Sequence, residues 1–122
     1  MTTLEVGNKL VELCKQGKAH EAMEALYAPD IVAVEAAAMQ NMPAETRGID
    51  AVRAKSKWWA DNHTVHSATV EGPWPNGDRF AVKFVYDVTR KAANQRFKME
   101  EIGLYTVKND KIVREEFFYV TG

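Results

Sequence analysis

The sequence has a single cysteine, Cys14, among its 122 residues. One thiol cannot form a disulfide within the chain, and Cys14 and the three histidines do not show the spacing of metal ligands. We therefore expect neither an internal disulfide nor a metal or other cofactor. Cys14 falls on the apolar side of a predicted helix, where it should pack as a small hydrophobic side chain.

The chain also has little net charge and no long apolar run. Its 16 basic and 17 acidic residues leave a formal charge of −1, so nothing predicts binding to nucleic acid or to an anionic membrane surface. No apolar stretch approaches the roughly 20 residues that cross a bilayer. The opening residues, MTTLEVGNKL, lack the basic and apolar regions of a signal peptide. We expect one domain over residues 1–122, located in the cytoplasm.

The most informative stretch that is present is a C-terminal hairpin, Arg96 to Thr121. Two runs rich in β-branched and aromatic residues flank Asn109 and Asp110, which tolerate the positive φ angles of a tight turn. A two-residue turn places Leu104 opposite Glu115. The face that we expect to line a hollow then carries Glu100, Ile102, Leu104, Val113, Glu115, Phe117 and Tyr119.

The facing of this hairpin stays open on the sequence alone. If 91–94 is a four-residue turn, the apolar face of the strand before it continues into Phe97, Met99 and Tyr105. Glu101 and Glu116 then point into the hollow instead, and a bulge in either hairpin also exchanges the two faces. Both faces are too apolar to contact water, which predicts a homodimer packed sheet to sheet about a two-fold axis.

The rest of the chain changes between helical and extended patterns. Helical periodicity covers residues 3–16, 18–27 and 48–62. Alternation rich in β-branched residues covers 30–36, 64–71 and 79–90. The segment 37–47 has no steady period and is expected to be a loop of the kind that covers a site. Helices followed by a strand meander predict an α+β fold, with three N-terminal helices on a curved, mainly antiparallel sheet around a cone-shaped pocket.

This order of elements resembles the nuclear transport factor 2-like superfamily, and in particular its SnoaL-like branch. The resemblance covers residues 4–119 and rests on the segments KQGKAHEAMEALYAPDIVAVE, RGIDAV, NGDRFAVKF and NDKIVREEFFY. It implies the cystatin-like fold that is shared with ketosteroid isomerase, scytalone dehydratase, limonene epoxide hydrolase and polyketide cyclases. The superfamily also contains proteins that only bind or act as scaffolds, and its members commonly form dimers through the sheet.

The resemblance also implies roles for particular positions. Glu35 matches the place where the isomerase carries its general base, which implies an acid–base role for this glutamate. The oxyanion tyrosine and the oxyanion acid of the isomerase fall near Leu10 and Ile102, which implies that both donors are lost.

Two acids are the candidates for catalysis, Glu35 and Glu115. A glutamate in mid-strand, such as Glu115, needs a partner or a ligand, and a carboxyl in a dry cavity can move protons near neutral pH. The competing interpretations are a solvated Glu35 at a strand end and an internal ion pair at Glu115. The residues expected to line the pocket are Tyr27, Trp58, Trp59, Glu100, Ile102, Phe117 and Tyr119.

These residues predict proton transfer on a small hydrophobic cyclic substrate, in an isomerisation, dehydration or cyclisation. The alternative is a dimeric module that binds a small molecule or a protein without catalysis. Convergence of two acids in a closed hollow would favour the enzyme.

Overall fold

The structure, a computed structural model, describes residues 1–38 and 43–120. Within these described residues, three helices and six strands follow one another. The elements are α1 (Thr3–Lys15), α2 (Ala19–Leu26), β1 (Tyr27–Val34), β2 (Glu45–Arg47), α3 (Ile49–Asn62), β3 (His63–Asn76), β4 (Arg79–Arg90), a 3₁₀ turn (Lys91–Ala93), β5 (Gln95–Lys108) and β6 (Lys111–Phe118).

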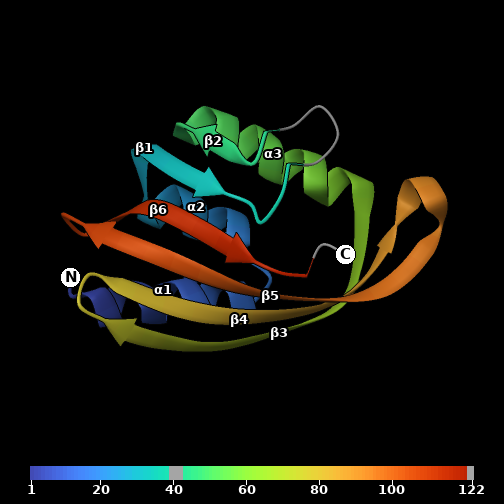
Figure 1. Ribbon diagram of the computed structural model, residues 1–122. Helices are drawn as coiled ribbons and strands as arrows, with labels where there is room; N and C mark the ends of the chain where they lie inside the picture. Colours follow the sequence, from blue (N-terminus) through green and yellow to red (C-terminus); the bar gives the residue numbers. More distant parts are fainter. Residues whose placement is uncertain (39–42, 121–122) are drawn as a thin grey trace.

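The strands form one sheet in the order β2–β1–β6–β5–β4–β3 (Figure 1). From β3 to β6 neighbouring strands are antiparallel, and β1 joins β6 in parallel. α1 packs against β3 and β4, whereas α2 and α3 pack against β1. The predicted α+β fold, with three helices on a mainly antiparallel sheet, is confirmed.

The helix ends coincide with capping signals in the sequence. The Thr2 hydroxyl accepts the N–H of Glu5, and the Glu5 carboxylate accepts the N–H of Thr2, which closes a capping box at the start of α1. Gly17 follows α1 with a φ of 73°, a conformation that glycine adopts without a Cβ clash and that ends helices. All three predicted helices are confirmed to within one residue at each end.

The N-terminal part of the sheet differs from the prediction of one strand over residues 30–36, because β1 spans Tyr27–Val34 and a second strand follows it. β1 begins at Tyr27, directly after α2, and so contains Pro29. The proline is tolerated because pairing with β6 is interrupted between Tyr27 and Val32. The segment predicted to be a loop contains strand β2, which pairs with β1. Residues 39–42 of that segment lie outside the described residues, so its role as a cover stays a prediction.

The C-terminal hairpin has the expected turn. Asn109 and Asp110 have φ angles of 52° and 66°, which match a two-residue turn between twisted strands. Lys108 lies opposite Lys111, as the sequence predicts.

The register of the hairpin changes one step beyond the turn. Val113 is an extra residue on β6, because the next pair after Val107–Ile112 is Thr106–Arg114. Tyr105, rather than Leu104, therefore lies opposite Glu115. The predicted pairing of Leu104 with Glu115 is wrong because the sequence does not reveal this extra residue.

The shift brings acids from both strands to one face of the sheet. Glu101 lies opposite Phe84 on β4, and Glu115 lies opposite Tyr105. Phe84 and Tyr105 are 3% and 2% exposed, so this face is the one covered by the helices. Alternate residues such as Ile102 point to the other face.

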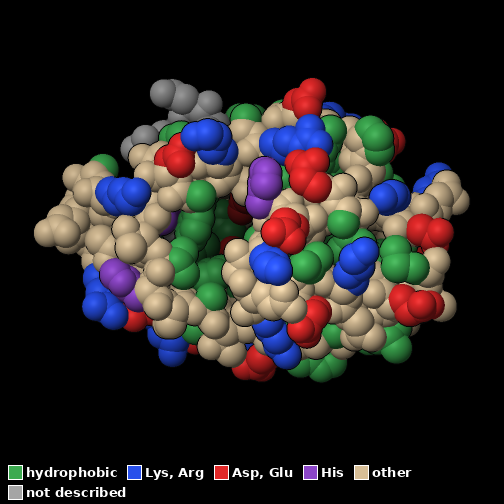
Figure 2. Space-filling model, turned by 180° about the vertical axis from the view of Figure 1, so that it is seen from behind, with side chains coloured by type: hydrophobic (Ala, Val, Ile, Leu, Met, Phe, Trp, Pro, Cys, Tyr) green, Lys and Arg blue, Asp and Glu red, His purple; other side chains and the backbone are tan. Residues whose placement is uncertain are grey.

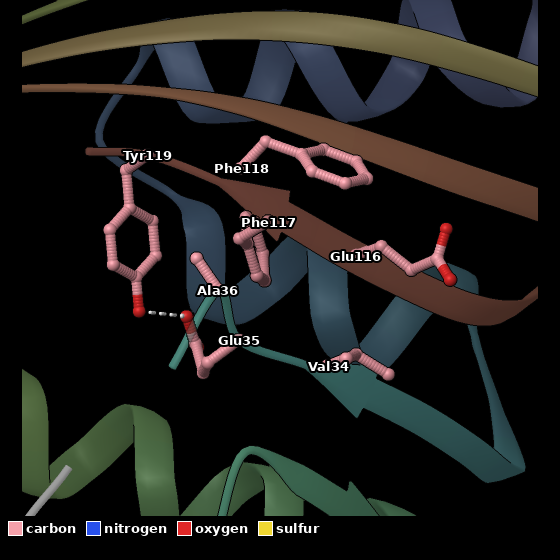
Figure 3. A pocket seen from close by; sticks show the side chains of 7 residues that line it. All are labelled: Val34, Glu35, Ala36, Glu116, Phe117, Phe118 and Tyr119. Atoms are coloured by element: carbon pink, nitrogen blue, oxygen red, sulfur yellow. Dashed lines mark hydrogen bonds between the residues drawn. The ribbon is translucent and has the colours of Figure 1, made fainter. Parts of the chain in front are cut away.

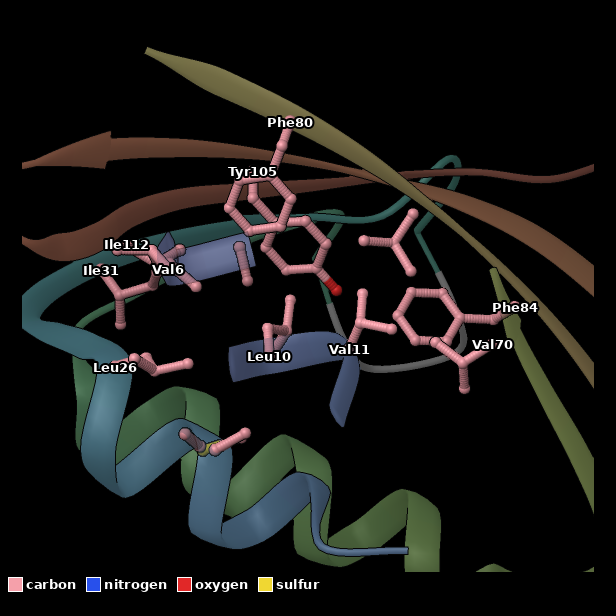
Figure 4. Close-up of a cluster of buried hydrophobic side chains, with 14 of the residues drawn as sticks. Val6, Leu10, Val11, Leu26, Ile31, Val70, Phe80, Phe84, Tyr105 and Ile112 are labelled. Carbon is pink, nitrogen blue, oxygen red and sulfur yellow. The ribbon is translucent and has the colours of Figure 1, made fainter. Parts of the chain in front are cut away.

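The core fills the space between this face and the helices (Figure 4). Phe80 is fully buried and stacks on Tyr105, with ring centroids 5.0 Å apart. Apolar side chains of α1 and α2 pack below these rings, among them Val6, Leu10 and Leu26. Leu10 is thus a core residue.

Leu26→Ala tests this packing against a matched leucine at the surface. Leu26 is completely buried, so its truncation should lower the free energy of unfolding by about 2–5 kcal/mol through lost burial and an unfilled cavity. Leu4, on α1, is 46% exposed, and Leu4→Ala should change it by no more than about 0.5 kcal/mol. Urea denaturation measures both, and equal losses would contradict the assigned core.

Candidate functional site

Glu35 follows the last residue of β1 and is held by two side chains. Its Oε1 lies 2.6 Å from Lys55 Nζ, and its Oε2 accepts a hydrogen bond from the Tyr119 hydroxyl at 3.2 Å (Figure 3). The side chains of Glu35 and Lys55 are 20% and 18% exposed. Because the pair is only partly hydrated, Lys55 and Tyr119 fix the carboxylate more firmly than a surface ion pair would.

A cavity of about 280 Å³ adjoins this carboxylate. It is lined by Val34, Glu35, Ala36, Glu116, Phe117, Phe118 and Tyr119. Lys55 Nζ also lies 6.0 Å from the centroid of the Phe117 ring, within the range of a cation–π contact. The cavity volume is close to the lower end of the range for small-molecule sites.

Glu115 lies deeper, beneath the sheet face. It is 4% exposed, and its Oε2 accepts a hydrogen bond from the Tyr27 hydroxyl. Burial raises the pKa of Glu115 to about 7, although Tyr27 and Lys55 act to lower it. Burial also raises the pKa of Tyr27, and the Glu115 charge adds to this, so the phenol stays protonated as the donor.

Glu101 projects from β5 toward the same region. Burial, together with the charges of Glu35 and Glu115, raises its pKa to about 7 against the opposing charge of Lys55. Among the described residues its carboxyl has no hydrogen-bond or ion-pair partner. The carboxyl is therefore held in a site that favours its protonated form.

An aromatic row leads from α3 to Glu101. The His63 ring stacks on Trp59 with centroids 4.3 Å apart, Trp59 lies 6.0 Å from Tyr86, and Tyr86 lies 6.0 Å from Phe84. Phe84 is the residue opposite Glu101. On the helix side, Figure 2 shows a hollow with hydrophobic walls and acidic side-chain atoms visible deep inside it.

The structure brings together most of the predicted site. Glu35 and Tyr119 are in contact, Phe117 adjoins them, and Tyr27 binds Glu115. Trp59 lies in the aromatic row and is partly buried.

Three of the predicted lining residues are placed elsewhere. Glu100 and Ile102, 57% and 37% exposed, lie on the outer face, because the extra residue Val113 reverses the facing on which the prediction rests. Trp58 is 41% exposed on the outer side of α3, because two consecutive helical residues point about 100° apart and only Trp59 can face inward.

Two residues of the site escape sequence reasoning. Glu101 emerges only in the alternative facing of the hairpin. Lys55 stands three residues after the buried Val52 and four before Trp59, and this helical spacing places it on the inward side of α3. That spacing is the signal that could identify Lys55.

Other groups offer little for chemistry. Cys14 is partly buried, and burial raises the pKa of its thiol to about 11, which disfavours the reactive thiolate. Within residues 1–38 and 43–120, no three His, Cys, Asp or Glu side chains are grouped to hold a metal ion. In the same residues, no helix is both long and apolar enough to span a bilayer.

Comparison with known proteins identifies the family. The family model described as a SnoaL-like domain matches residues 1–119. A solved structure from Mesorhizobium loti is 49% identical, with 98% of this chain and 100% of that one covered and a TM-score of 0.91. It is described as a SnoaL-like polyketide cyclase, with carbohydrate phosphatase added in brackets. The chain belongs to the SnoaL-like family. No curated protein matches this SnoaL-like chain.

More distant structures share the SnoaL-like fold alone. A protein with a cystatin-like fold from Xanthomonas campestris is 16% identical, with a TM-score of 0.80 over 99% of this chain and 92% of that one. A protein with a ketosteroid isomerase-like fold from Catenulispora acidiphila is 21% identical, with a TM-score of 0.73 over 97% of this chain and 87% of that one. Both agree with the fold predicted from the sequence.

Because the pKa of Glu101 is raised, the free energy of unfolding should depend on pH. Between pH 4.5, the ordinary pKa of a glutamate, and about pH 7, the folded chain holds a proton that the unfolded chain releases. This contribution is therefore complete below pH 4.5 and is lost as pH rises through 7, by up to about 3 kcal/mol. Glu101→Gln should flatten the fall in unfolding free energy between pH 5 and 8.

Urea denaturation across this pH range measures the slope. Glu100→Gln is the matched control, because Glu100 is exposed on the outer face and should leave the slope unchanged. Parallel curves for wild type and Glu101→Gln would show that Glu101 does not hold the extra proton.

Proposed function

We propose that the chain is an enzyme that removes a proton from carbon beside a carbonyl group of a small, largely apolar cyclic molecule. The observation that carries this proposal is the Glu35 carboxylate, held between Lys55 and Tyr119 at the edge of a cavity. Lys55 and Tyr119 each occupy one lone pair of the Glu35 carboxylate. The remaining lone pairs of the carboxylate can accept a proton. A positioned carboxylate is a common general base.

The family relation supports this class of reaction. The 49% identical protein from Mesorhizobium loti is described as a polyketide cyclase. Cyclisation, isomerisation and many dehydrations of carbonyl compounds begin with loss of the same kind of proton. Glu115, buried and bonded to Tyr27, would support the site electrostatically from behind, and Phe117 and Tyr119 would contact an apolar ring.

Exchange of hydrogen for deuterium tests the function without knowledge of the native substrate. In D₂O, wild type should accelerate exchange beside the carbonyl of at least one of cyclohexanone, 1-indanone and 2-tetralone, followed by proton NMR. Glu35→Gln cannot accept the proton and should lower the rate by about 10²–10⁴-fold.

The control for this experiment is Glu45→Gln. Glu45 is a surface residue of β2 that pairs with Arg47, and its loss should leave the rate unchanged. Ketones that bind without faster exchange in wild type would favour the alternative, a binding module without catalysis.

We also propose that two copies pack through the outer face of the sheet. Trp74 and Phe118 are each 54% exposed there, and Ile102 lies between Lys83 and Phe118 in the strand register. Such an apolar surface favours a partner. Glu71 lies opposite Lys83, so the patch contains both signs of charge and a second copy of it is not repelled.

Sedimentation tests the dimer. At micromolar concentration, wild type should sediment with twice the 13.7 kDa mass of one chain. Ile102→Glu should give the monomer, because it buries an unpaired charge in the interface. Leu4→Glu, an equally drastic change at an exposed position of α1, should leave the dimer intact. A monomeric wild type would exclude the interface.

A further inference from the structure

The hydroxyl of Tyr105 is a buried polar group that no other side chain satisfies. Tyr105 is 2% exposed, and Figure 4 shows its hydroxyl on the side of the sheet that α1 covers. Among the described residues no hydrogen bond reaches this hydroxyl, and no fully enclosed side-chain oxygen is left without one. The hydroxyl therefore borders the open space of the hollow, where a ligand can reach it.

Gly103 allows this hydroxyl to turn toward Glu101. Residues 101, 103 and 105 share the inner face of β5, because alternate residues of a strand face the same way. The ring of Tyr105 lies over Gly103, where an added Cβ would be 2.8 Å from Cε2 and 3.0 Å from the hydroxyl oxygen. The hydroxyl is thus turned along the strand, and both Glu101 and Glu115 lie close enough to act on it electrostatically.

The two acids add unpaired oxygens to the same space. The Glu101 carboxyl has no partner among the described residues, and of the two oxygens of Glu115 only Oε2 accepts a hydrogen bond from them. Lys55, a cation that acts on both acids, is already bound to Glu35. The described residues thus place acceptors and negative charge here in excess of positive charge.

We propose that this space binds the protonated amine of a cyclic ligand, with Glu101, Glu115 and Tyr105 as acceptors for its N–H groups. An ammonium group has three donors and no acceptor, which matches three accepting groups. Its positive charge also offsets the excess of carboxylates over lysine. As a statement about the substrate, the proposal rests on the proposed function and adds an ammonium group to the cyclic molecule described there.

The aromatic rings of the inner face suit the rest of such a ligand. The Tyr86 ring lies 6.0 Å from Trp59 and 6.0 Å from Phe84 between centroids, and Phe84 lies opposite Glu101. Ring faces attract cations as well as flat apolar groups. A flat ring that carries an ammonium group therefore matches both the aromatic row and the acids.

Binding of an ammonium group should release protons from the two acids. Burial raises the pKa of Glu101 and of Glu115 to about 7, with neighbouring carboxylates contributing, and a bound cation favours the ionised forms. Protons therefore compete with the ligand below pH 7. The affinity for an ammonium group should rise as pH increases through 7.

The groups around the two acids do not reverse this direction. Those that act on them, or on which they act, are Cys14 on α1, Tyr27, Glu35, Lys55 on α3, Tyr86 on β4, Tyr105 and Tyr119. Burial raises the pKa of the thiol and of the four phenols, so these stay protonated up to pH 8. The carboxylate and the ammonium of the remaining two residues form an ion pair.

Calorimetry with 2-aminotetralin between pH 5.5 and 8.0 tests the proposal. The amine stays protonated in this range, as a lysine side chain does. 2-Tetralol has the same rings with a neutral hydroxyl in place of the ammonium group and is the matched ligand. Wild type should bind 2-aminotetralin about tenfold or more tightly at pH 8.0 than at pH 5.5, and at pH 8.0 more tightly than 2-tetralol. The affinity for 2-tetralol should not rise with pH.

Three variants locate the site. Glu101→Gln removes a charge that binds the ammonium group and should weaken 2-aminotetralin binding at pH 8.0 about tenfold or more, with a smaller dependence on pH. Tyr105→Phe keeps the ring that stacks on Phe80 and should weaken binding about fivefold. Glu100→Gln, changed at the adjacent but outward residue, should bind as wild type. Circular dichroism confirms that the variants fold.

The outcomes separate this site from the proposed function. Wild type that binds 2-tetralol at least as tightly as 2-aminotetralin at pH 8.0, or that binds neither, overturns the ammonium site. Equal binding of 2-aminotetralin by wild type and Glu101→Gln also overturns it. Exchange of the neutral ketones in wild type would then leave the proposed function standing. The predicted binding of 2-aminotetralin without exchange of any ketone supports the ammonium site and overturns the proposed function.

Discussion

One extra residue in the last strand determines which side chains form the site. Val113 shifts the pairing of β6 with β5 by one position, and in a strand a one-residue shift moves every later side chain to the opposite face. With the shift, Glu115 and Phe117 face the helices beside Glu101. Without it, Glu101 would share its face with Glu116 and Phe118, and Glu115 would lie on the outer face. Which side chains of β6 lie on the inner face of the sheet thus depends on one local irregularity in the strand pairing.

The inner face then contains three acids, and each is accommodated in a different way. Glu35 is paired with a cation, Lys55. Glu115 accepts a hydrogen bond from a phenol, Tyr27. Glu101, which has neither kind of partner within residues 1–38 and 43–120, is favoured in its neutral form. A single lysine cannot neutralise three carboxylates in a region of low hydration, so at least one of the acids binds a proton near neutral pH. The shortage of positive charge thus leaves the neutral form of an acid favoured on the inner face.

Much of the fold follows from the sequence because its signals are local. Capping residues, glycines with positive φ and the Asn109–Asp110 turn define elements within a few positions of themselves. The facing of the last hairpin depends instead on Val113, which is an ordinary β-branched strand residue and gives no local signal. The prediction that Glu100 and Ile102 line the site is wrong for that reason, whereas Glu35 follows β1 and does not depend on the bulge.

Glu101 is the residue whose presence the fold explains least. An apolar side chain opposite Phe84 would extend the core and would carry no desolvation cost, and buried ionisable groups are often replaced by hydrophobic ones with a gain in stability. The carboxyl instead lowers stability above its pKa while it contacts no partner among the described residues. Groups that cost stability in this way are concentrated at sites of binding and catalysis. The same feature that makes Glu101 unfavourable for folding therefore leaves its carboxyl free for a ligand.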